Sequence, residues 1–504
     1  MKHKLPYVIS FFSGFLSLAL EIIWMRIISF AGMTVPQSFS YTLALFLIGI
    51  SIGAYLGKII CKKIYNIDSR LIGSIFLIAA IIDIILFFIS VYSAKYTESF
   101  ILIAGVCVLI CASIRGMVFP LVHHIGTSQI KSGSQISNVY FSNVFGSSIA
   151  PILISFIALD YFSTQQVYFL ICMITLALSF LCVSDIKPKL LITVGICSIF
   201  FLLFIPEQLI NSLSKDSYKP NLYPSKIIEN KHGFIQVYDD LEEKDQAVFG
   251  ANVYDGKLNT NIFHNTNGID RAYLLPVLKP EAKEVLVIGL STGSWVQVLS
   301  TMPNIKKITV VEINPAYAEL VKSSPIVSEI FKDKRIDFVF DDGRKWIKKN
   351  KNKKFDIILI NTTWHWRAYS TNLLSADFLN IVKSKLNADG IIFYNSTMSS
   401  PVYFTANHVF PFVYKYKYFV LASMQPVKPK DLQTSSKILC ELKYNHNQKP
   451  VFMNQSECDS AANIIMKNPI TPYKDIDFSS KPPQPLELIT DDNMIIEYKY
   501  GKGL

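Results

Sequence analysis

The sequence predicts a multi-span α-helical membrane domain of about seven transmembrane helices, followed by a soluble α/β domain with a mainly parallel sheet. Two observations predict this architecture. Residues 1–207 are long apolar runs with sparse charge, whereas residues 208–504 are rich in Lys, Asp and Asn. From residue 284 onward, short apolar strand patterns alternate with helical patterns, which is typical of a doubly wound parallel sheet.

The membrane domain is predicted from the length of its apolar runs. A bilayer core requires about 20 apolar residues per helix. Seven such runs occur, at residues 7–30, 39–61, 71–92, 98–122, 137–159, 164–183 and 189–206. The first run is too long, and too closely followed by others, to be a cleaved signal peptide. We therefore expect the chain to reside in a lipid bilayer, a bacterial-type inner (plasma) membrane.

Basic residues in the loops predict the orientation of these spans. They precede the first span and follow the second, fourth and sixth, at Lys2, Lys4, Lys62, Lys63, Arg70, Lys131, Lys187 and Lys189. The opposite loops carry only Lys95. This pattern places the N-terminus in the cytoplasm. Seven spans then place the soluble domain on the extracytoplasmic side.

Four ionisable residues lie within the predicted spans. Glu21, Asp83 and Arg115 sit at membrane depth, where a charge is costly and usually faces a partner or a water-filled cavity. Arg26 lies nearer the end of its span and could reach the interface. We predict a Glu21–Arg115 ion pair, and both a structural pair and a substrate path remain open.

The cysteines and the charge limit other classes of function. Only Cys440 and Cys458 lie in the soluble half, where they form either a disulfide or two unpaired thiols. No Cys or His spacing suits a structural zinc, so no metal is expected. The net charge of +11 is accompanied by no nucleic-acid-binding motif, so no nucleic-acid partner is expected.

The soluble half begins with a proline-containing linker over 208–224 and a small β-rich element over 225–280. Residues 234–238 and 247–249 alternate like short strands, and Asp255-Gly256 predicts a hairpin turn. Five further strands are then predicted at 284–289, 308–311, 336–340, 355–360 and 390–394. Residues 281–440 form this sheet domain, and 441–504 are a C-terminal extension.

Candidate ligand-binding residues follow three of these strands. A glycine turn with Gly289, Thr292 and Gly293 follows the first, Glu312 ends the second, and Asp342-Gly343 follows the third. Ligands of such sheets bind at the carboxyl ends of the strands, and an acidic residue about 20 positions after the glycine can accept both ribose hydroxyls. The pattern favours a nucleoside pocket over an empty one.

At these residues the chain resembles a known family, the spermidine synthases (polyamine aminopropyltransferases), and specifically their membrane-fused branch. The resemblance covers nearly the full length. Outside the sheet it rests on Ser13–Phe15, Glu21–Arg26, Ser38–Ser40, Gly49–Gly57, Gly116–Pro120, Asn143–Gly146, Thr490-Asp491-Asp492 and Glu497-Tyr498. The resemblance implies an S-adenosylmethionine methyltransferase-like (Rossmann-type) fold and a decarboxylated S-adenosylmethionine donor. It further implies that Glu312 holds the ribose hydroxyls, that Asp342 accepts from the adenine amino group, and that Gly289 and Gly293 form the turn.

The departures from the family pattern concern the catalytic acids. Thr292 stands where the family has an aspartate that binds the transferred chain, and Asn361 stands at the general-base aspartate. An amide cannot take the proton of an ammonium nucleophile, so ordinary spermidine synthesis is not expected. His365 is either a replacement base or a surface histidine. Trp295, Trp364 and Trp366 could stack on a ligand or fill the pocket.

Two functions therefore stay open. In the first, an S-adenosyl donor, either S-adenosylmethionine or its decarboxylated form, gives a methyl or aminopropyl group to a small-molecule or lipid-linked acceptor delivered by the membrane. In the second, the soluble domain has lost its chemistry and serves as an extracytoplasmic binding or scaffold module for a membrane protein partner. The side of the membrane on which this domain lies would discriminate between them.

Overall fold

The computed structural model describes residues 4–64, 67–96, 99–127, 133–183, 208–214, 217–361, 364–479 and 485–504. Two compact units make up the chain, Met1–Phe234 with Leu504 and Ile235–Gly503. The predicted span 189–206 and the loop lysines Lys2, Lys131, Lys187 and Lys189 lie outside the described residues.

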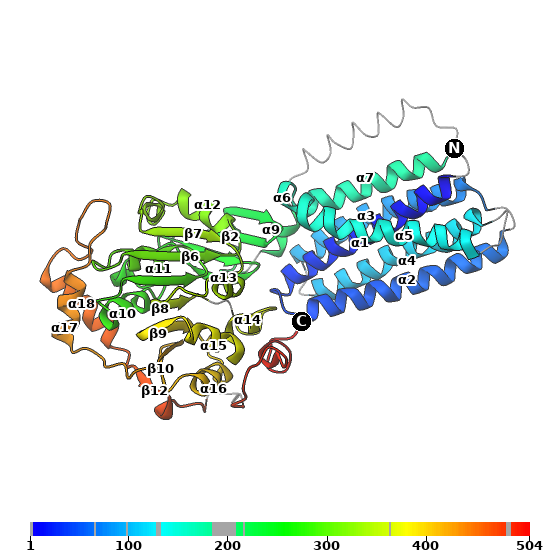
Figure 1. Ribbon diagram of the computed structural model, residues 1–504. Coiled ribbons are helices and arrows are strands. Elements are labelled where there is room, and N and C mark those ends of the chain that lie inside the picture. The colour runs from blue at the N-terminus through cyan, green and yellow to red at the C-terminus, as the bar shows by residue number, and fades with distance from the viewer. Residues whose placement is uncertain are drawn as a thin grey trace. The chain divides into compact units, whose positions relative to one another are not determined.

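Long apolar helices run side by side in the first unit (Figure 1). Within the described ranges, six helical segments have the length and composition needed to cross a membrane. They are α1 (Leu5–Ala31), α2 (Gln37–Lys63), α3 (Ser69–Tyr96), α4 (Phe100–Gly126), the run from α5 (Gly133–Leu153) through η2 (Ile154–Ala158) and α6 (Leu159–Tyr161), and α7 (Thr164–Cys182). Six of the seven predicted apolar helices are therefore confirmed, each at or near its predicted position.

Small residues allow α2 and α4 to pack closely. A Cβ atom on Gly53 would lie 2.0 Å from the Ser113 carbonyl oxygen, and one on Gly116 would lie 2.6 Å from the Ile50 carbonyl oxygen. Neither position tolerates a side chain. Close backbone approach of this kind commonly stabilises helix association in lipid. The hydrophobic effect contributes little there, because lipid tails are as apolar as the helix surfaces.

The predicted Glu21–Arg115 pair is wrong, because Arg115 pairs with Asp83 instead. The Arg115 guanidinium donates from Nη1 to Asp83 Oδ1 at 3.0 Å and from Nη2 to Oδ2 at 2.5 Å. Both side chains are buried, at 2% and 0% exposure. The fork geometry of a guanidinium matches a carboxylate in this two-bond arrangement. Tyr168 donates its hydroxyl to the Asp83 carbonyl at 2.8 Å and fixes α7 against α3.

Arg26 binds the segment that precedes the second unit. Its Nε donates to Thr164 Oγ1 at 2.9 Å and its Nη2 donates to the Asn230 carbonyl at 2.6 Å. The side chain of Glu229 accepts from the backbone N–H and the hydroxyl of Thr164. These bonds hold β1 (Lys226–Asn230) to the helical unit, so the unit boundary falls at Phe234, beyond the predicted linker over 208–224.

A short antiparallel meander opens the second unit, formed by β2 (Gly233–Asp240), β3 (Asp245–Gly250) and β4 (Val253–Lys257). The predicted turn at Asp255-Gly256 is wrong, because both residues lie inside β4. The turn is instead Ala251-Asn252, with φ of 49° and 62°. Two consecutive left-handed residues match the twist of a two-residue hairpin, and the Asn252 N–H donates to Gln236 Oε1 at 2.7 Å.

Within the described residues, the main sheet has eight strands in the order β12-β10-β11-β9-β8-β5-β6-β7. Strands β5 (Glu284–Ile288), β6 (Lys307–Glu312), β7 (Ile336–Phe340), β8 (Phe355–Ile360) and β9 (Leu386–Asn395) pair in parallel, as predicted. The antiparallel strands β10 (Phe412–Tyr416), β11 (Phe419–Ser423) and β12 (Thr471–Pro472) extend one edge and were not predicted.

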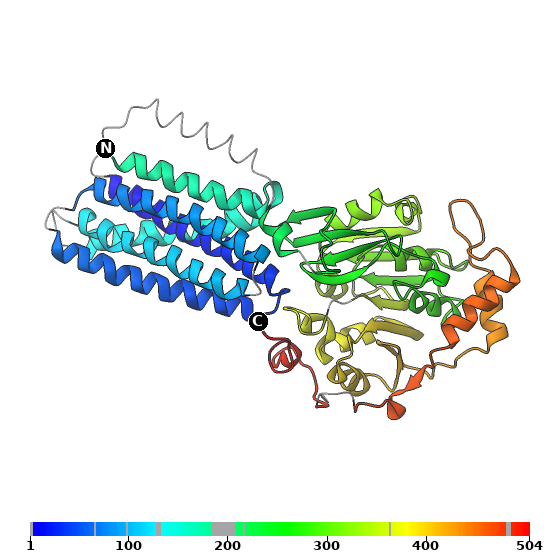
Figure 2. The same ribbon diagram turned by 180° about the vertical axis from the view of Figure 1, so that it is seen from behind.

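Helices flank this sheet in both views (Figure 1, Figure 2). They are α10 (Asp270–Leu278), α11 (Ser294–Ser300), α12 (Ala316–Ser323), α13 (Gly343–Lys349), α14 (Thr371–Leu374), α15 (Ala376–Lys383) and α16 (Ser400–Val409). Strand residues such as Ile358, Ile360 and Ile392 are fully buried in the core between the layers. The predicted Rossmann-type α/β fold is confirmed.

The C-terminal extension adds a helix pair and a tail. A disulfide joins Cys440 in α17 (Leu432–Cys440) to Cys458 in α18 (Gln455–Met466). In the tail, Asp491 accepts from the Arg344 guanidinium at 2.8 Å. Glu497, in α19 (Ile495–Tyr498), accepts from the backbone N–H groups of Tyr369 and Thr371, each at 2.9 Å. The tail therefore fixes the loop that follows β8.

Replacing Arg115 by Met should destabilise the helical unit by about 3–5 kcal/mol, because the buried Asp83 carboxylate loses its counter-charge. The double variant Asp83→Leu/Arg115→Met should recover most of this loss. Equilibrium unfolding of the full chain in detergent would measure both changes, with Lys62→Met, an exposed residue at the end of α2, as the control. An unchanged free energy of unfolding in Arg115→Met would show that Asp83 does not depend on Arg115 as its counter-charge.

Candidate functional site

The crevice of the sheet opens where β5 and β8 lie side by side, because the chain leaves these neighbouring strands toward opposite edges of the sheet. The backbone N–H of Asn361 donates to the Ile288 carbonyl at 2.9 Å. A Cβ atom on Gly289 would lie 2.8 Å from the Asn361 carbonyl oxygen. Two predicted site residues, Gly289 and Asn361, are thus brought into contact at the switch point.

The turn after β5 requires glycine at two positions. Gly289 has φ of 91° and Gly293 has φ of 74°, both in the region that favours glycine. A Cβ atom on Gly293 would also lie 2.8 Å from Val321 Cγ1. The Thr292 side chain is buried and donates to Ser294 Oγ at 3.0 Å, so it does not face the crevice with a charge as an aspartate would.

Glu312 ends β6 and is turned toward the glycine turn. Its carboxylate accepts from the backbone N–H of Leu290 at 2.7 Å and from that of Asn314 at 2.8 Å. Burial raises the pKa of Glu312 to about 7, against the lowering effect of these N–H donors. Each carboxylate oxygen has a second lone pair, so the group retains acceptor capacity for hydroxyls.

Asp342 and Gly343 lie at the end of β7, next to β6. The Asp342 carboxylate caps α13 by accepting from the Lys345 N–H at 2.7 Å. A Cβ atom on Gly343 would lie 2.4 Å from Ile288 Cγ2, so only glycine fits there. Beside them two apolar side chains are uncovered, Ile313 at 56% and Phe340 at 50% exposure. This edge therefore combines two carboxylates with an open apolar surface.

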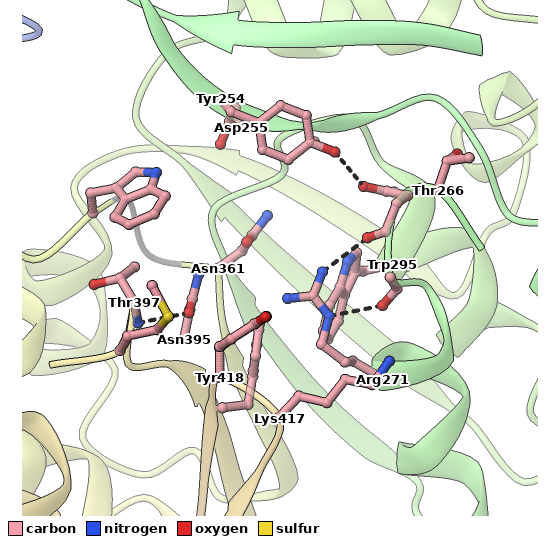
Figure 3. A pocket seen from close by; sticks show the side chains of 16 residues that line it. Tyr254, Asp255, Thr266, Arg271, Trp295, Asn361, Asn395, Thr397, Lys417 and Tyr418 are labelled. Atoms are coloured by element: carbon pink, nitrogen blue, oxygen red, sulfur yellow. Dashed lines mark hydrogen bonds between the residues drawn. The ribbon is translucent and has the colours of Figure 1, made fainter. Parts of the chain in front are cut away.

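A cavity of about 430 Å³ opens beside Asn361, which is one of its lining residues (Figure 3). Its aromatic lining comes from Tyr254, Trp295, Trp364, Tyr418 and Phe419. Its amide lining comes from Asn267, Asn361 and Asn395, and its charged lining from Asp255, Arg271 and Lys417. The volume is in the usual range of small-molecule sites. Trp295 and Trp364 therefore line the cavity and leave room in it.

Two of the charged lining groups are paired within the fold. Lys417 Nζ lies 2.5 Å from Asp270 Oδ2, and the Asp270 side chain is fully buried. Asp255 bonds with the Tyr317 hydroxyl and faces the Arg367 guanidinium. Burial raises the pKa of the Asp255 carboxyl, against the lowering effect of these two partners. Sequence reasoning missed both arrangements. It assigned Asp255 to a turn, and it singled out neither Asp270 nor Lys417.

His365 lies beside the cavity but is buried, at 7% exposure. Its Nδ1 and its backbone N–H both contact Thr397 Oγ1, at 2.6 and 3.1 Å. Burial lowers the pKa of His365 to about 4, against the raising effect of Thr397. The imidazole is then neutral at pH 7, and its basicity is too low to remove a proton from an ammonium group efficiently.

Residues 274–410 match the family model of the spermine/spermidine synthase domain. The chain carries a spermidine-synthase-like domain. The match contains the glycine turn, Glu312, Asp342 and Asn361, and so covers the crevice described above. The cavity residue Arg271 lies just before it. Among the described residues, no group of three or more His, Cys, Asp or Glu could hold a metal ion.

Proteins named polyamine aminopropyltransferase are similar to this chain. One from Oceanobacillus iheyensis is 22% identical over 385 residues, which cover 73% of this chain and 72% of that protein. That share of the chain exceeds the soluble half. One from Clostridioides difficile is 35% identical over 111 residues, and the chain spans only 39% of its length. The solved spermidine synthase of Thermotoga maritima is 18% identical, with a TM-score of 0.36, over 48% of this chain and 85% of its own.

The contribution of His365 to the unfolding free energy of the spermidine-synthase-like domain should fall as the pH falls below 6.5. The His365 pKa is about 4 when folded and about 6.5 when unfolded, so the unfolded state binds more protons between these values. The contribution of this group should fall by about 2 kcal/mol between pH 8 and pH 5.

Denaturant unfolding of the wild-type chain and of His365→Gln, each at pH 8 and at pH 5, would measure the contribution of His365 to the unfolding free energy. The comparison isolates His365 from Glu312, whose raised pKa acts in the opposite direction and removes stability as the pH rises through 7. Equal pH dependence in the two proteins would show that His365 titrates normally, and a role as base would then gain support.

Proposed function

We propose that the chain is a membrane-anchored group transferase that uses an S-adenosyl donor and does not make spermidine. The observation that carries the proposal is the edge formed by β6 and β7. Register pairing sets Glu312 beside Phe340, and Asp342 follows two residues later. Two carboxylates, an adjacent glycine turn and the uncovered Ile313 and Phe340 suit the hydroxyls, the amino group and the faces of an adenosine.

The residues present fit such a donor. Glu312 would accept from the ribose hydroxyls, Asp342 from the adenine amino group, and Ile313 and Phe340 would cover the base. When bound, the donor supplies an alkyl group attached to a sulfonium centre. The chain's own contribution is to position the acceptor in the cavity beyond Asn361 and to exclude water from it.

The chemistry of the cavity disfavours a polyamine acceptor. The lining includes Arg271 and Lys417, and its one carboxylate, Asp255, faces Arg367. A polycation would meet no uncompensated negative charge there. Asn361 cannot remove a proton, and the low pKa of His365 makes it a weak substitute. The acceptor is therefore a group that reacts without losing a proton to Asn361.

A second function is favoured by a separate observation, the Cys440–Cys458 disulfide. Disulfides persist outside the cytoplasm. Arg26, near the end of α1, contacts Thr164, and the neighbouring Gln165 accepts from the Gln208 N–H at 3.1 Å. Gln208 thus lies at the end of α1 opposite Leu5, about 40 Å along the helix. With a cytoplasmic N-terminus the domain is extracytoplasmic, which favours a binding module without catalysis.

Methylthioadenosine should bind the purified full chain in nanodiscs, and Glu312→Ala should weaken that binding at least tenfold by removing the acceptor for two hydroxyls. Calorimetric titration would measure both. Asp337→Ala, an exposed carboxylate earlier on the same sheet, is the control and should bind as the wild type does. A folded wild-type chain that binds neither methylthioadenosine nor S-adenosylmethionine at millimolar concentration would refute the transferase.

If the domain is extracytoplasmic, Cys440 and Cys458 should become labelled in intact cells. The measurement treats cells with a membrane-impermeant phosphine and then with an impermeant maleimide. Labelling should depend on prior reduction and should disappear in Cys440→Ser/Cys458→Ser. Labelling that requires cell lysis would place the domain in the cytoplasm and remove the support for the binding module.

A further inference from the structure

The cavity contains one basic side chain whose charge is not matched by a bonded carboxylate. Arg271 is the second residue of α10 and projects into the cavity. Its Nε donates to the Gly268 carbonyl at 2.8 Å and its Nη2 donates to the Asn267 carbonyl at 2.9 Å. Figure 3 shows the remaining nitrogen, Nη1, without a bond and directed into the cavity.

The position of the guanidinium is fixed before any ligand arrives. Its carbon lies 4.8 Å from the centre of the Phe419 ring and 5.4 Å from that of Trp295, so both rings pack against it. The side chain folds back over Gly268, whose φ of 60° favours glycine and where a Cβ atom would lie 2.8 Å from Nη2. A preorganised donor of this kind loses little entropy on binding.

The neighbouring acid, Asp270, attracts Arg271 but is shared with other donors. The Asp270 carboxylate is engaged by Lys417 at 2.5 Å, by Asn265 Nδ2 at 2.8 Å and by the Tyr416 hydroxyl at 3.3 Å. Asp255, on another wall, faces Arg367 and Tyr317. The two carboxylates thus face three cations, Arg271, Arg367 and Lys417, so this set of charges keeps a net positive charge.

We propose that Arg271 anchors a carboxylate, so that the ligand of this cavity is an anion-bearing molecule rather than a polyamine. This inference rests on the proposed function and specifies the class of ligand that the cavity binds. Two sources could supply the carboxylate: the amino-acid portion of intact S-adenosylmethionine, which the decarboxylated donor lacks, or the acceptor. Asn361 and Asn395 provide amide groups on the same walls for the remaining polar atoms.

The test compares three nucleosides on the full chain in nanodiscs: methylthioadenosine, decarboxylated S-adenosylmethionine and S-adenosylmethionine. A hydrogen-bonded charge pair contributes about 1.5–3 kcal/mol, or about 10- to 150-fold in affinity. If the donor carries the carboxylate, S-adenosylmethionine should bind at least tenfold more tightly than its decarboxylated form. Arg271→Met should remove that difference and leave methylthioadenosine binding unchanged.

If the acceptor carries the carboxylate, the two donors should bind alike. Succinate, used as a probe, should then bind the chain saturated with methylthioadenosine and should lose that binding in Arg271→Met. Arg271→Lys keeps the charge but loses the planar guanidinium that can donate two bonds to one carboxylate. It should therefore retain only part of the affinity for succinate. Lys449→Met, at an exposed position, controls for the change in net charge.

The inference would be overturned if neither donor preference nor succinate binding depended on Arg271, or if spermidine bound more tightly than succinate. A failure of the proposed function is distinct, because methylthioadenosine itself would then not bind. Arg271→Gln is a second substitution should Arg271→Met unfold, and thermal unfolding of each variant in nanodiscs identifies that case.

Discussion

The parallel pairing of β5 with both β6 and β8 is the constraint on which the rest of the site depends. This pairing brings the ends of three strands to one edge of the sheet. It also forces the turn after β5 against the turn after β8, where Gly289 and the Asn361 carbonyl leave no room for a Cβ atom. The cavity adjoins the edge formed by β6 and β7, because Asp255 lines the cavity and interacts electrostatically with Glu312.

The second constraint is the balance of charge around the cavity. Taking a charge out of water is costly unless a partner compensates it. The domain meets this requirement twice, in Asp270 with Lys417 and in Asp255 with Arg367. Arg271 has only a share of Asp270, and it is also bonded to two carbonyls and packed against two aromatic rings. Carbonyls solvate a guanidinium without cancelling its charge, which is why this residue, and not Lys417, defines the electrostatic character of the cavity.

Much of this structure could be predicted from the sequence, and the parts that could not share a physical reason. The buried strands β5 to β9 are continuous apolar runs with polar ends, which identify both the strand and its site residues. Strands β10 and β11 were missed because their turn is Lys417-Tyr418, in which Lys417 takes a φ of 52° without a glycine or asparagine to mark it. Asp255-Gly256 resembled a turn, but tertiary pairing holds it in β4.

The missed site residues depend on contacts between distant segments. Asp83 and Arg115 were both recognised as costly in a membrane, yet the correct pairing requires knowing which faces of α3 and α4 meet. Arg271 resembled an ordinary residue of a first helical turn. The available signal was its context, since the remainder of α10, from Ala272 to Leu278, is buried, and a lone cation at the start of a buried helix requires an explanation.

The loss of the catalytic acids and the gain of a cavity cation belong together physically. A polyamine site requires acids that attract a cation and one that takes its proton. By the resemblance to spermidine synthases, the base position would be Asn361 and the chain-binding position the buried Thr292, and Arg271 and Lys417 line the cavity with positive charge. A transfer from a sulfonium to an anionic group neutralises two charges and releases no proton, so it needs neither acid. Each departure therefore removes a residue that amine transfer requires, and none of them impairs the binding of an anion.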